Sequence, residues 1–334
     1  MPGEIFLPRE LIDYIIQYFV SDVDKSSLLA CIRLSRQWHA SAFPALFHQI
    51  ILRSDGRTHD TFTKFGRRAP PADKAHLVKT LIVFCQQPIG LRSNSINTYE
   101  LCLILSKFPA IHSLSIVEAN LVWSSRQLRG WSKRSIVDLR LSEVQCQMSD
   151  WIAGVTPLKC SLVQFLVEVF ASVHVLHLSG VQLRSAFGHN SIGYTTRIDT
   201  TMHPRAADRP EHSIPSVHKL VLPLWQSSTE CITATKLLKS VQVLDQLHSV
   251  RLDQDPLTTR AVLQVVGHTI HNLHLSINVS YRQVPIKFNT DSYPDAFSNL
   301  KSTSTTRTTV CPTAPPYPIC ASAYAAKVDH TVML

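Results

Sequence analysis

Hydrophobic residues recur at helical spacing within the first twenty residues of the chain. Pro8 suits the first turn of a helix, because the N–H that proline lacks has no partner there. The apolar residues that follow it, at offsets of one, three and four, are Leu11, Ile12, Ile15, Ile16 and Phe19. This spacing predicts a helix with an apolar face, starting close to Pro8.

Two more short helices are predicted before residue 50. The second starts at about Asp24, with Asp24 or Ser26 as its cap and Leu28, Leu29 and Ile32 as its apolar stripe. The third runs from about Ser35 to Leu46, and Pro44 splits or kinks it. Three such helices bury little surface alone. They either cap the domain that follows or form a docking module whose apolar face a partner completes.

The residues of this segment resemble an F-box, over residues 5–51. The matching pattern is Leu7-Pro8-x-Glu10-Leu11-x-x-x-Ile15-x-x-x-Phe19, then Ser27-Leu28-Leu29-Ala30-Cys31-x-x-x-Ser35-Arg36-x-Trp38, then Leu46-Phe47-x-x-Ile50. Phe19 stands where the family often has Leu, and Leu34 where Val is usual. The resemblance implies docking on a Skp-type adaptor and, through it, on a cullin-RING ubiquitin ligase. The adaptor-binding residues that it implies are Leu7, Pro8, Leu11, Ile15, Leu28, Leu29 and Trp38.

A six-residue template, apolar-x-x-apolar-x-apolar, recurs along the rest of the chain. Its seven copies are Val78-Leu81-Val83, Ile111-Leu114-Ile116, Ile136-Leu139-Leu141, Val173-Leu176-Leu178, Val217-Leu220-Leu222, Leu247-Val250-Leu252 and Ile270-Leu273-Leu275. The last two apolar positions alternate with polar or small ones, which is typical of a strand with one buried face. Helix-like runs at 99–108, 162–170, 232–244 and 258–266 separate several copies.

The template resembles the irregular leucine-rich repeats found behind F-boxes in fungal proteins. The Asn or Cys that commonly follows the strand is absent from most copies, which leaves the repeat count open. The expected fold is α/β: a three-helix F-box at 5–51, a linker at 52–76 and an irregular leucine-rich-repeat solenoid with a parallel sheet at 77–300. Residues 184–213 are expected to form an inserted loop. The low-complexity tail, 301–334, is expected to be disordered.

In such a solenoid, residues between the apolar template positions face outward and bind the target. The candidates for target contact are Arg140, His177, Arg251, Asp253 and His274, with Ser142, Ser179 and Ser276 nearby on the same face. For each of them an ordinary solvated surface position is the competing interpretation.

Composition restricts the function further. The chain has 334 residues and a formal charge of +9, but its Lys and Arg are scattered and no nucleic-acid-binding module is recognisable, so we expect no nucleic-acid partner. Eight single cysteines without a C-x-x-C pair indicate reduced core residues of an intracellular protein, cytoplasmic or nuclear. Charges at Glu4, Arg9, Glu10 and Asp13 argue against a signal peptide, and we expect no membrane association.

No catalytic constellation stands out. Neither a phosphate-binding loop nor a nucleophile elbow is present, so we expect no enzyme and no cofactor. His268-x-x-His271-x-x-His274 has the composition of a metal site, yet it overlaps the seventh template, where positions three apart point to opposite faces. We therefore expect no metal there, although a metal-dependent enzyme using these histidines is a third hypothesis.

The leading hypothesis is a substrate-recognition adaptor of an SCF-type ubiquitin ligase. The F-box would dock on the Skp-type adaptor and the solenoid would hold an unknown target, so that the ligase acts by proximity. The alternative is a leucine-rich-repeat interaction scaffold without a ubiquitin-ligase role, whose first helices only cap the repeats.

Overall fold

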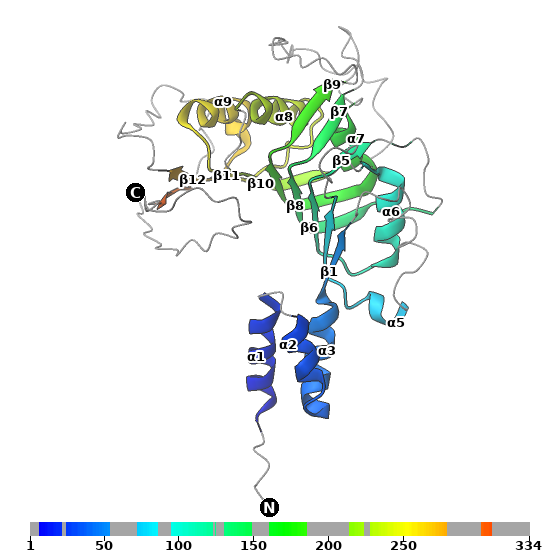
Figure 1. The fold of residues 1–334 in the computed structure, drawn as a ribbon. Helices are drawn as coiled ribbons and strands as arrows, with labels where there is room; N and C mark the ends of the chain where they lie inside the picture. Colours follow the sequence, from blue (N-terminus) through cyan, green and yellow to red (C-terminus); the bar gives the residue numbers. More distant parts are fainter. Residues whose placement is uncertain are drawn as a thin grey trace, which may run out of the picture. The chain divides into compact units, whose positions relative to one another are not determined.

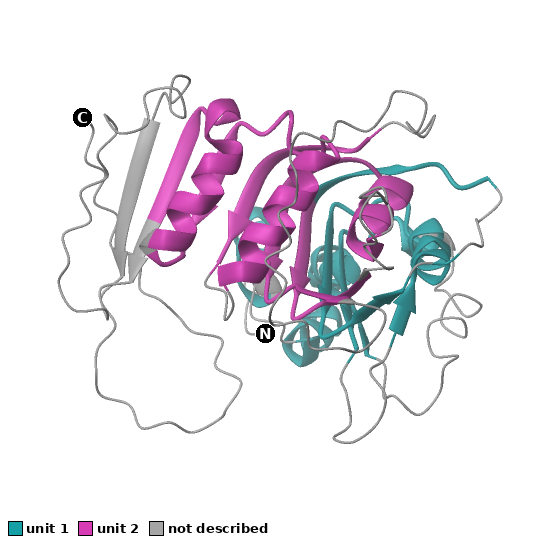
Figure 2. Cartoon of the chain, turned by 90° about the horizontal axis from the view of Figure 1, so that it is seen from above, with its two compact units in different colours: residues 1–137 teal, residues 138–334 magenta. Residues whose placement is uncertain are grey.

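The computed structural model describes residues 7–21, 25–53, 72–85, 95–122, 124, 130–148, 160–185, 214–223, 228–278 and 302–308. The chain divides into two compact units, residues 1–137 and 138–334, which are coloured separately in Figure 2. The fold is α/β with parallel strands, as the sequence predicts. The strand order of the larger sheet is β1-β2-β4-β6-β8-β10-β11-β12-β13, and a smaller sheet has the order β3-β5-β7-β9.

Unit 1 begins with helices and continues into strands. Its elements are α1 (Arg9–Ser21), α2 (Lys25–Ile32), α3 (Arg36–His48), β1 (Gln49–Arg53), α5 (Ala72–Ala75), β2 (Thr80–Phe84), β3 (Ser95–Asn97), α6 (Thr98–Lys107), β4 (Ser113–Val117), β5 (Asn120–Val122) and the first residues of β6 (Arg134–Ser142).

Unit 2 alternates strands with helices. After the remainder of β6 it contains β7 (Gln145–Met148), α7 (Ser161–Val169), β8 (Phe170–Ser179), β9 (Gln182–Ser185), β10 (Ser216–Leu222), α8 (Ser228–Ser240), β11 (Ser249–Leu252), α9 (Pro256–Val266), a 3-10 helix (Gly267–Thr269), β12 (Asn272–Asn278) and β13 (Ser302–Thr308). Helices α8 and α9 pack side by side along one face of their strands (Figure 2).

The three N-terminal helices begin close to the residues that the sequence predicts, and they differ from the prediction at Pro44. Ser35 caps α3, because its Oγ accepts a hydrogen bond from the amide of Trp38. Pro44 does not split α3, which continues through it to His48. The predicted cap Asp24 lies outside the described residues. Gln49 then enters β1 directly, so that β1, together with α5, occupies part of the segment expected to be a linker.

The last two apolar residues of all seven copies of the template lie on strands of the larger sheet. Neighbouring copies pair in parallel with equal template positions aligned: Leu81 opposite Leu114, Leu176 opposite Leu220, and Val250 opposite Leu273. The last two apolar residues of every copy are buried. This alternation buries one face of each strand, while the residues between the apolar positions are mostly less buried.

The smaller sheet arises from a repeated bend after the template. Glu118, Glu143 and Gly180 each follow a strand of the larger sheet, and all three adopt left-handed backbone angles, with φ of 53°, 54° and 62°. Each bend leads into a short strand of the smaller sheet: β5, β7 and β9 respectively. The sequence analysis did not predict this second sheet.

The end of the described chain differs from expectation. Residues 302–308, expected to be disordered, form β13, which pairs in parallel with β12 from Asn272 opposite Ser302 to Asn278 opposite Thr308. The polar sequence of β13 gave no hydrophobic alternation to detect, and backbone pairing with β12 alone defines it. Residues 309–334 and most of the predicted inserted loop, 186–213, lie outside the described residues, whereas β9 occupies the start of that loop.

The cysteines in the described residues are buried: Cys31, Cys85, Cys102, Cys146, Cys160 and Cys231. Burial, with a smaller contribution from the negative charge of Glu100, raises the pKa of the Cys85 thiol to about 12. Burial and the charge of Asp255 do the same for Cys231. These two thiols therefore stay protonated near neutral pH, which suits core residues rather than nucleophiles.

Candidate functional site

Helix α1 has apolar residues on two of its sides. On the inner side, Ile12 and Ile16 are buried in a cluster with Leu28, Cys31 and Ala42. This cluster holds α1, α2 and α3 together (Figure 1). A helix needs only one apolar side to pack in this way, so the apolar residues on its second side require another explanation.

The second side of α1 is a stripe of four residues, which we call the outer stripe: Leu11, Tyr14, Ile15 and Tyr18. Their spacing of three, four and seven places them in one row along the helix. Leu11 is 50% exposed, Tyr14 72% and Tyr18 71%, and Ile15 is half-buried. The outer stripe is therefore largely uncovered by the rest of the described chain.

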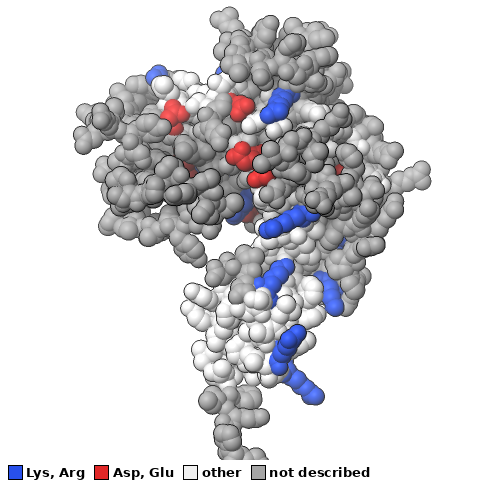
Figure 3. All heavy atoms as spheres, viewed as in Figure 1, with Lys and Arg blue, Asp and Glu red and all other residues white. Residues whose placement is uncertain are grey.

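Helix α2 extends the exposed apolar surface. Leu29 is 48% exposed, and Leu34, in the turn after α2, is 64% exposed. The polar side of α1, by contrast, carries Glu10, Asp13 and Gln17, with Arg9 close to Asp13. In the view of Figure 3 the surface of these helices is mostly uncharged, with a few Lys and Arg side chains.

The structure distributes the predicted adaptor-binding residues between surface and core. Pro8, Leu11 and Leu29 are exposed, and Ile15 is half-buried. Leu7 and Trp38 are half-buried against the helix cluster, and Gln37 donates a hydrogen bond to the carbonyl of Leu7. Leu28 is only 3% exposed and lies within the cluster. Sequence reasoning missed Tyr14 and Tyr18, although their spacing from Leu11 was the signal that could have identified them.

Four of the predicted target-binding residues lie on strands of unit 2, and Asp253 directly follows β11. Three of them share one row of the sheet, since His177 pairs with Val221, Val221 with Arg251, and Arg251 with His274. Arg251 is exposed, whereas His177 and His274 are half-buried. The structure thus brings these three predicted residues to equivalent positions on neighbouring strands.

Arg140, the predicted residue on β6, is linked to this row through Asp138. The carboxylate of Asp138 lies 2.8 Å from Nε of Arg140 and 3.0 Å from Nε2 of His177. Partial burial alone would raise the pKa of Asp138, but the contacts with His177 and Arg140 outweigh it and hold this pKa below its ordinary value. Asp138 was absent from the predicted set, because the residues chosen there all follow the central apolar position of the template and Asp138 precedes it.

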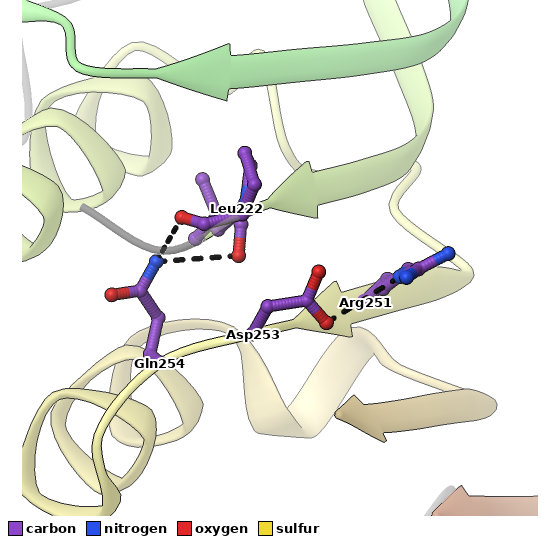
Figure 4. Close-up of polar contacts among 5 residues, drawn as sticks. Leu222, Arg251, Asp253 and Gln254 are labelled. Carbon is purple, nitrogen blue, oxygen red and sulfur yellow. Dashed lines mark hydrogen bonds and ion pairs between the residues drawn. The ribbon is translucent and has the colours of Figure 1, made fainter. Parts of the chain in front are cut away.

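Arg251 and Asp253 form a looser pair, 3.5 Å apart, at the carboxyl end of β11 (Figure 4). Next to them, Gln254 donates its side-chain amide to the carbonyls of Leu222 and Pro223 at the end of β10. The Asp253 amide also donates to Leu222. The end of β11 is therefore tied to the end of β10, and Asp253 projects from a constrained backbone.

The structure separates the histidines of the sequence cluster. His268 lies in the 3-10 helix, His271 precedes β12 and His274 lies within it. Among the described residues, no three side chains of His, Cys, Asp or Glu are arranged to hold a metal ion. This result offers no support for the hypothesis of a metal-dependent enzyme built on these three histidines.

No helix within the described ranges has both the length and the apolar character needed to span a bilayer. Comparison with protein-family models, curated proteins and solved structures finds no match to this chain.

Proposed function

We propose that the chain is a substrate-recognition adaptor of an SCF-type ubiquitin ligase, whose N-terminal helices dock on a Skp-type adaptor. The observation that carries this proposal is the exposure of the outer stripe. Tyrosines and leucines at helical spacing, uncovered along α1 and continued by Leu29, favour burial against another protein.

The separation of buried and exposed apolar residues on these helices supports the same proposal. Ile12, Ile16 and Leu28 already hold the three helices together, so the outer stripe is not needed for their packing. The residues that the F-box resemblance assigns to the adaptor and that remain accessible are Pro8, Leu11, Ile15 and Leu29. Tyr14 and Tyr18 add aromatic contact area to the same surface.

Target binding belongs to the strand face of unit 2 in this proposal. Arg140, His177, Arg251 and His274 present charged or titratable groups from β6, β8, β11 and β12, together with Asp253 at the end of β11. A target held there would be brought close to the ubiquitin-conjugating enzyme, and the chemistry would reside in the partner subunits.

Binding of the full-length chain to a purified Skp-type adaptor tests the proposal. Leu11→Lys combined with Leu29→Lys should weaken binding at least tenfold, because both changes place charge in the proposed interface. Gln17→Lys is the control, since it adds a positive charge to the exposed polar side of α1, outside the proposed interface. Leu7→Ala is a poorer probe, because Leu7 also packs against the helix cluster.

Two outcomes would contradict the ligase role. One is a wild-type chain that is folded, as judged by circular dichroism, and does not bind the adaptor. The other is a double variant that binds as well as Gln17→Lys. Either result would leave the alternative, a leucine-rich-repeat interaction scaffold whose N-terminal helices serve only its own packing.

A further inference from the structure

The second position of the template is histidine in most copies. It is Lys79, His112, Val137, His174, His218, His248 and His271 along the seven copies. Because neighbouring copies pair in parallel with equal positions aligned, equal residues come to lie side by side, roughly 5 Å apart. The pattern predicts a row of imidazole rings wherever successive copies carry histidine.

Unit 2 contains such a row, which we call the histidine ladder: His174, His218, His248 and His271. The centres of adjacent rings are 5.6 Å, 5.9 Å and 5.4 Å apart along the ladder. Backbone hydrogen bonds fix this arrangement, because the His248 amide donates to the His218 carbonyl and the His271 amide to the His248 carbonyl, each at 2.9 Å. His174 and His248 are exposed, and His218 and His271 are half-buried.

Ring orientation distinguishes the pairs of the ladder. The rings of His218 and His248 are stacked at 14°, so their in-plane nitrogen lone pairs run parallel and do not converge. The rings of His248 and His271 are inclined at 68° in an edge-to-face arrangement, so rotation of one ring would let a lone pair from each meet at one point. Two imidazoles that share a tetrahedral ion through bonds of about 2.0–2.1 Å have ring centres roughly 5 to 6 Å apart. The spacing of His248 and His271 falls in this range.

His271 also has a nitrogen available. Its Nδ1 is buried and makes no hydrogen bond within the described residues. Reorienting this ring toward an ion therefore breaks no hydrogen bond at Nδ1, and a bond to a metal would satisfy a nitrogen that is otherwise unpaired. Asp245, which lies close to His248 in sequence, forms an ion pair with Lys239 at 2.9 Å. We therefore expect water, and not this carboxylate, to complete the coordination of the ion.

We propose that His248 and His271 together bind a divalent transition-metal ion that prefers imidazole ligands, such as Cu²⁺ or Zn²⁺. The site has two protein ligands, in agreement with the absence of any three-residue metal group among the described residues. The ion bridges the segment before β11 to the segment before β12, and so links two adjacent copies of the template. The proposal does not depend on the ubiquitin-ligase function.

Electron paramagnetic resonance of the full-length, tag-free chain with one equivalent of Cu²⁺ at pH 7.5 tests the site directly. The expected spectrum shows hyperfine coupling to two imidazole nitrogens. His248→Asn changes an exposed side chain and should abolish the two-nitrogen signal and weaken Cu²⁺ binding at least tenfold. His112→Asn is the matched control, since His112 has the same template position but lies in unit 1, outside the ladder.

Thermal unfolding with Zn²⁺ provides a second readout. Zn²⁺ should raise the Tm of the wild type and of His112→Asn, and should leave the Tm of His248→Asn and His271→Asn unchanged. Absence of two-nitrogen coordination in the wild type would overturn the proposal. So would retention of the Cu²⁺ signal and the Zn²⁺ stabilisation in His248→Asn; the ladder would then be a packing feature only.

Discussion

Glu143 and Gly180 occupy the same position in two successive copies of the repeat. The carboxylate of Glu143 lies against the Cα of Gly180, where any other residue would have its side chain. A Cβ added to Gly180 would lie 2.6 Å from Oε1 of Glu143. The amide of Glu143 donates to the carbonyl of Ser179 at 2.8 Å, which holds the two bends together. Both residues have left-handed backbone angles, as Glu118 has after the preceding copy, so this bend recurs after three successive copies of the template.

Replacing Gly180 should therefore be unfavourable for two separable reasons. Gly180→Ala should lower the free energy of unfolding by about 1–2 kcal/mol through backbone strain, with a further loss from contact with the Glu143 carboxylate. In a Glu143→Ala background only the strain should remain. Urea unfolding of the two single variants and the double variant measures the coupling, and additive effects would show that the Glu143 contact is not significant.

Two adjacent residues of α1 should respond differently to truncation. Ile12→Ala should lower the free energy of unfolding by about 2–5 kcal/mol, because Ile12 is 1% exposed within the helix cluster. Leu11→Ala should change it by no more than about 0.5 kcal/mol, because Leu11 lies on the surface. Urea denaturation followed by circular dichroism compares them, and equal losses would mean that Leu11 is covered in solution.

Asp255 should be a stabilising cap of α9. Its carboxylate accepts hydrogen bonds from the amides of Leu257 and Thr258, both at 3.0 Å, and from Ser228 at the start of α8 at 3.1 Å. Asp255→Ala should lower the free energy of unfolding by about 1–2 kcal/mol. Asp245→Ala, which removes a surface ion pair with Lys239, should have a smaller effect. Thermal unfolding of the two variants and the wild type measures the difference.

The Asp138 contacts should make stability depend on pH in the acid range. The pKa of Asp138 is lowered in the folded state, so its contribution is present above the pKa of the unfolded chain and is lost as pH falls through the folded pKa. Asp138→Asn should be less stable than wild type by about 0.5–1 kcal/mol at pH 7.

Urea unfolding at a series of pH values measures this difference. The difference in the free energy of unfolding between wild type and Asp138→Asn should become smaller below about pH 4, where carboxyl groups protonate in the unfolded chain. Asp253→Asn, in the longer pair with Arg251, should change stability less at pH 7. A difference that stays constant down to pH 2 would contradict the role assigned to the carboxylate.

Local pattern was sufficient to predict the main elements. The template predicted every strand of the larger sheet that carries one of its seven copies, and the helix-like runs predicted α6, α7, α8 and α9, since each depends on residues close together in sequence. It did not predict β13, whose polar residues pair with β12. It also did not predict the smaller sheet, of which β5, β7 and β9 follow the bends at Glu118, Glu143 and Gly180.

Within the candidate site, sequence alone determined that α1 and α2 carry more apolar residues than one helix face needs. Only packing in three dimensions decided which of them are used internally: Leu28 is buried and its neighbour Leu29 is not, because successive helical residues point about 100° apart. The template places His248 and His271 at equal positions of adjacent copies, but only the structure shows how their rings are inclined. The contact of Asp138 with His177 required the register between strands. It joins two residues far apart along the chain at unequal positions of the template, so it depends on the fold.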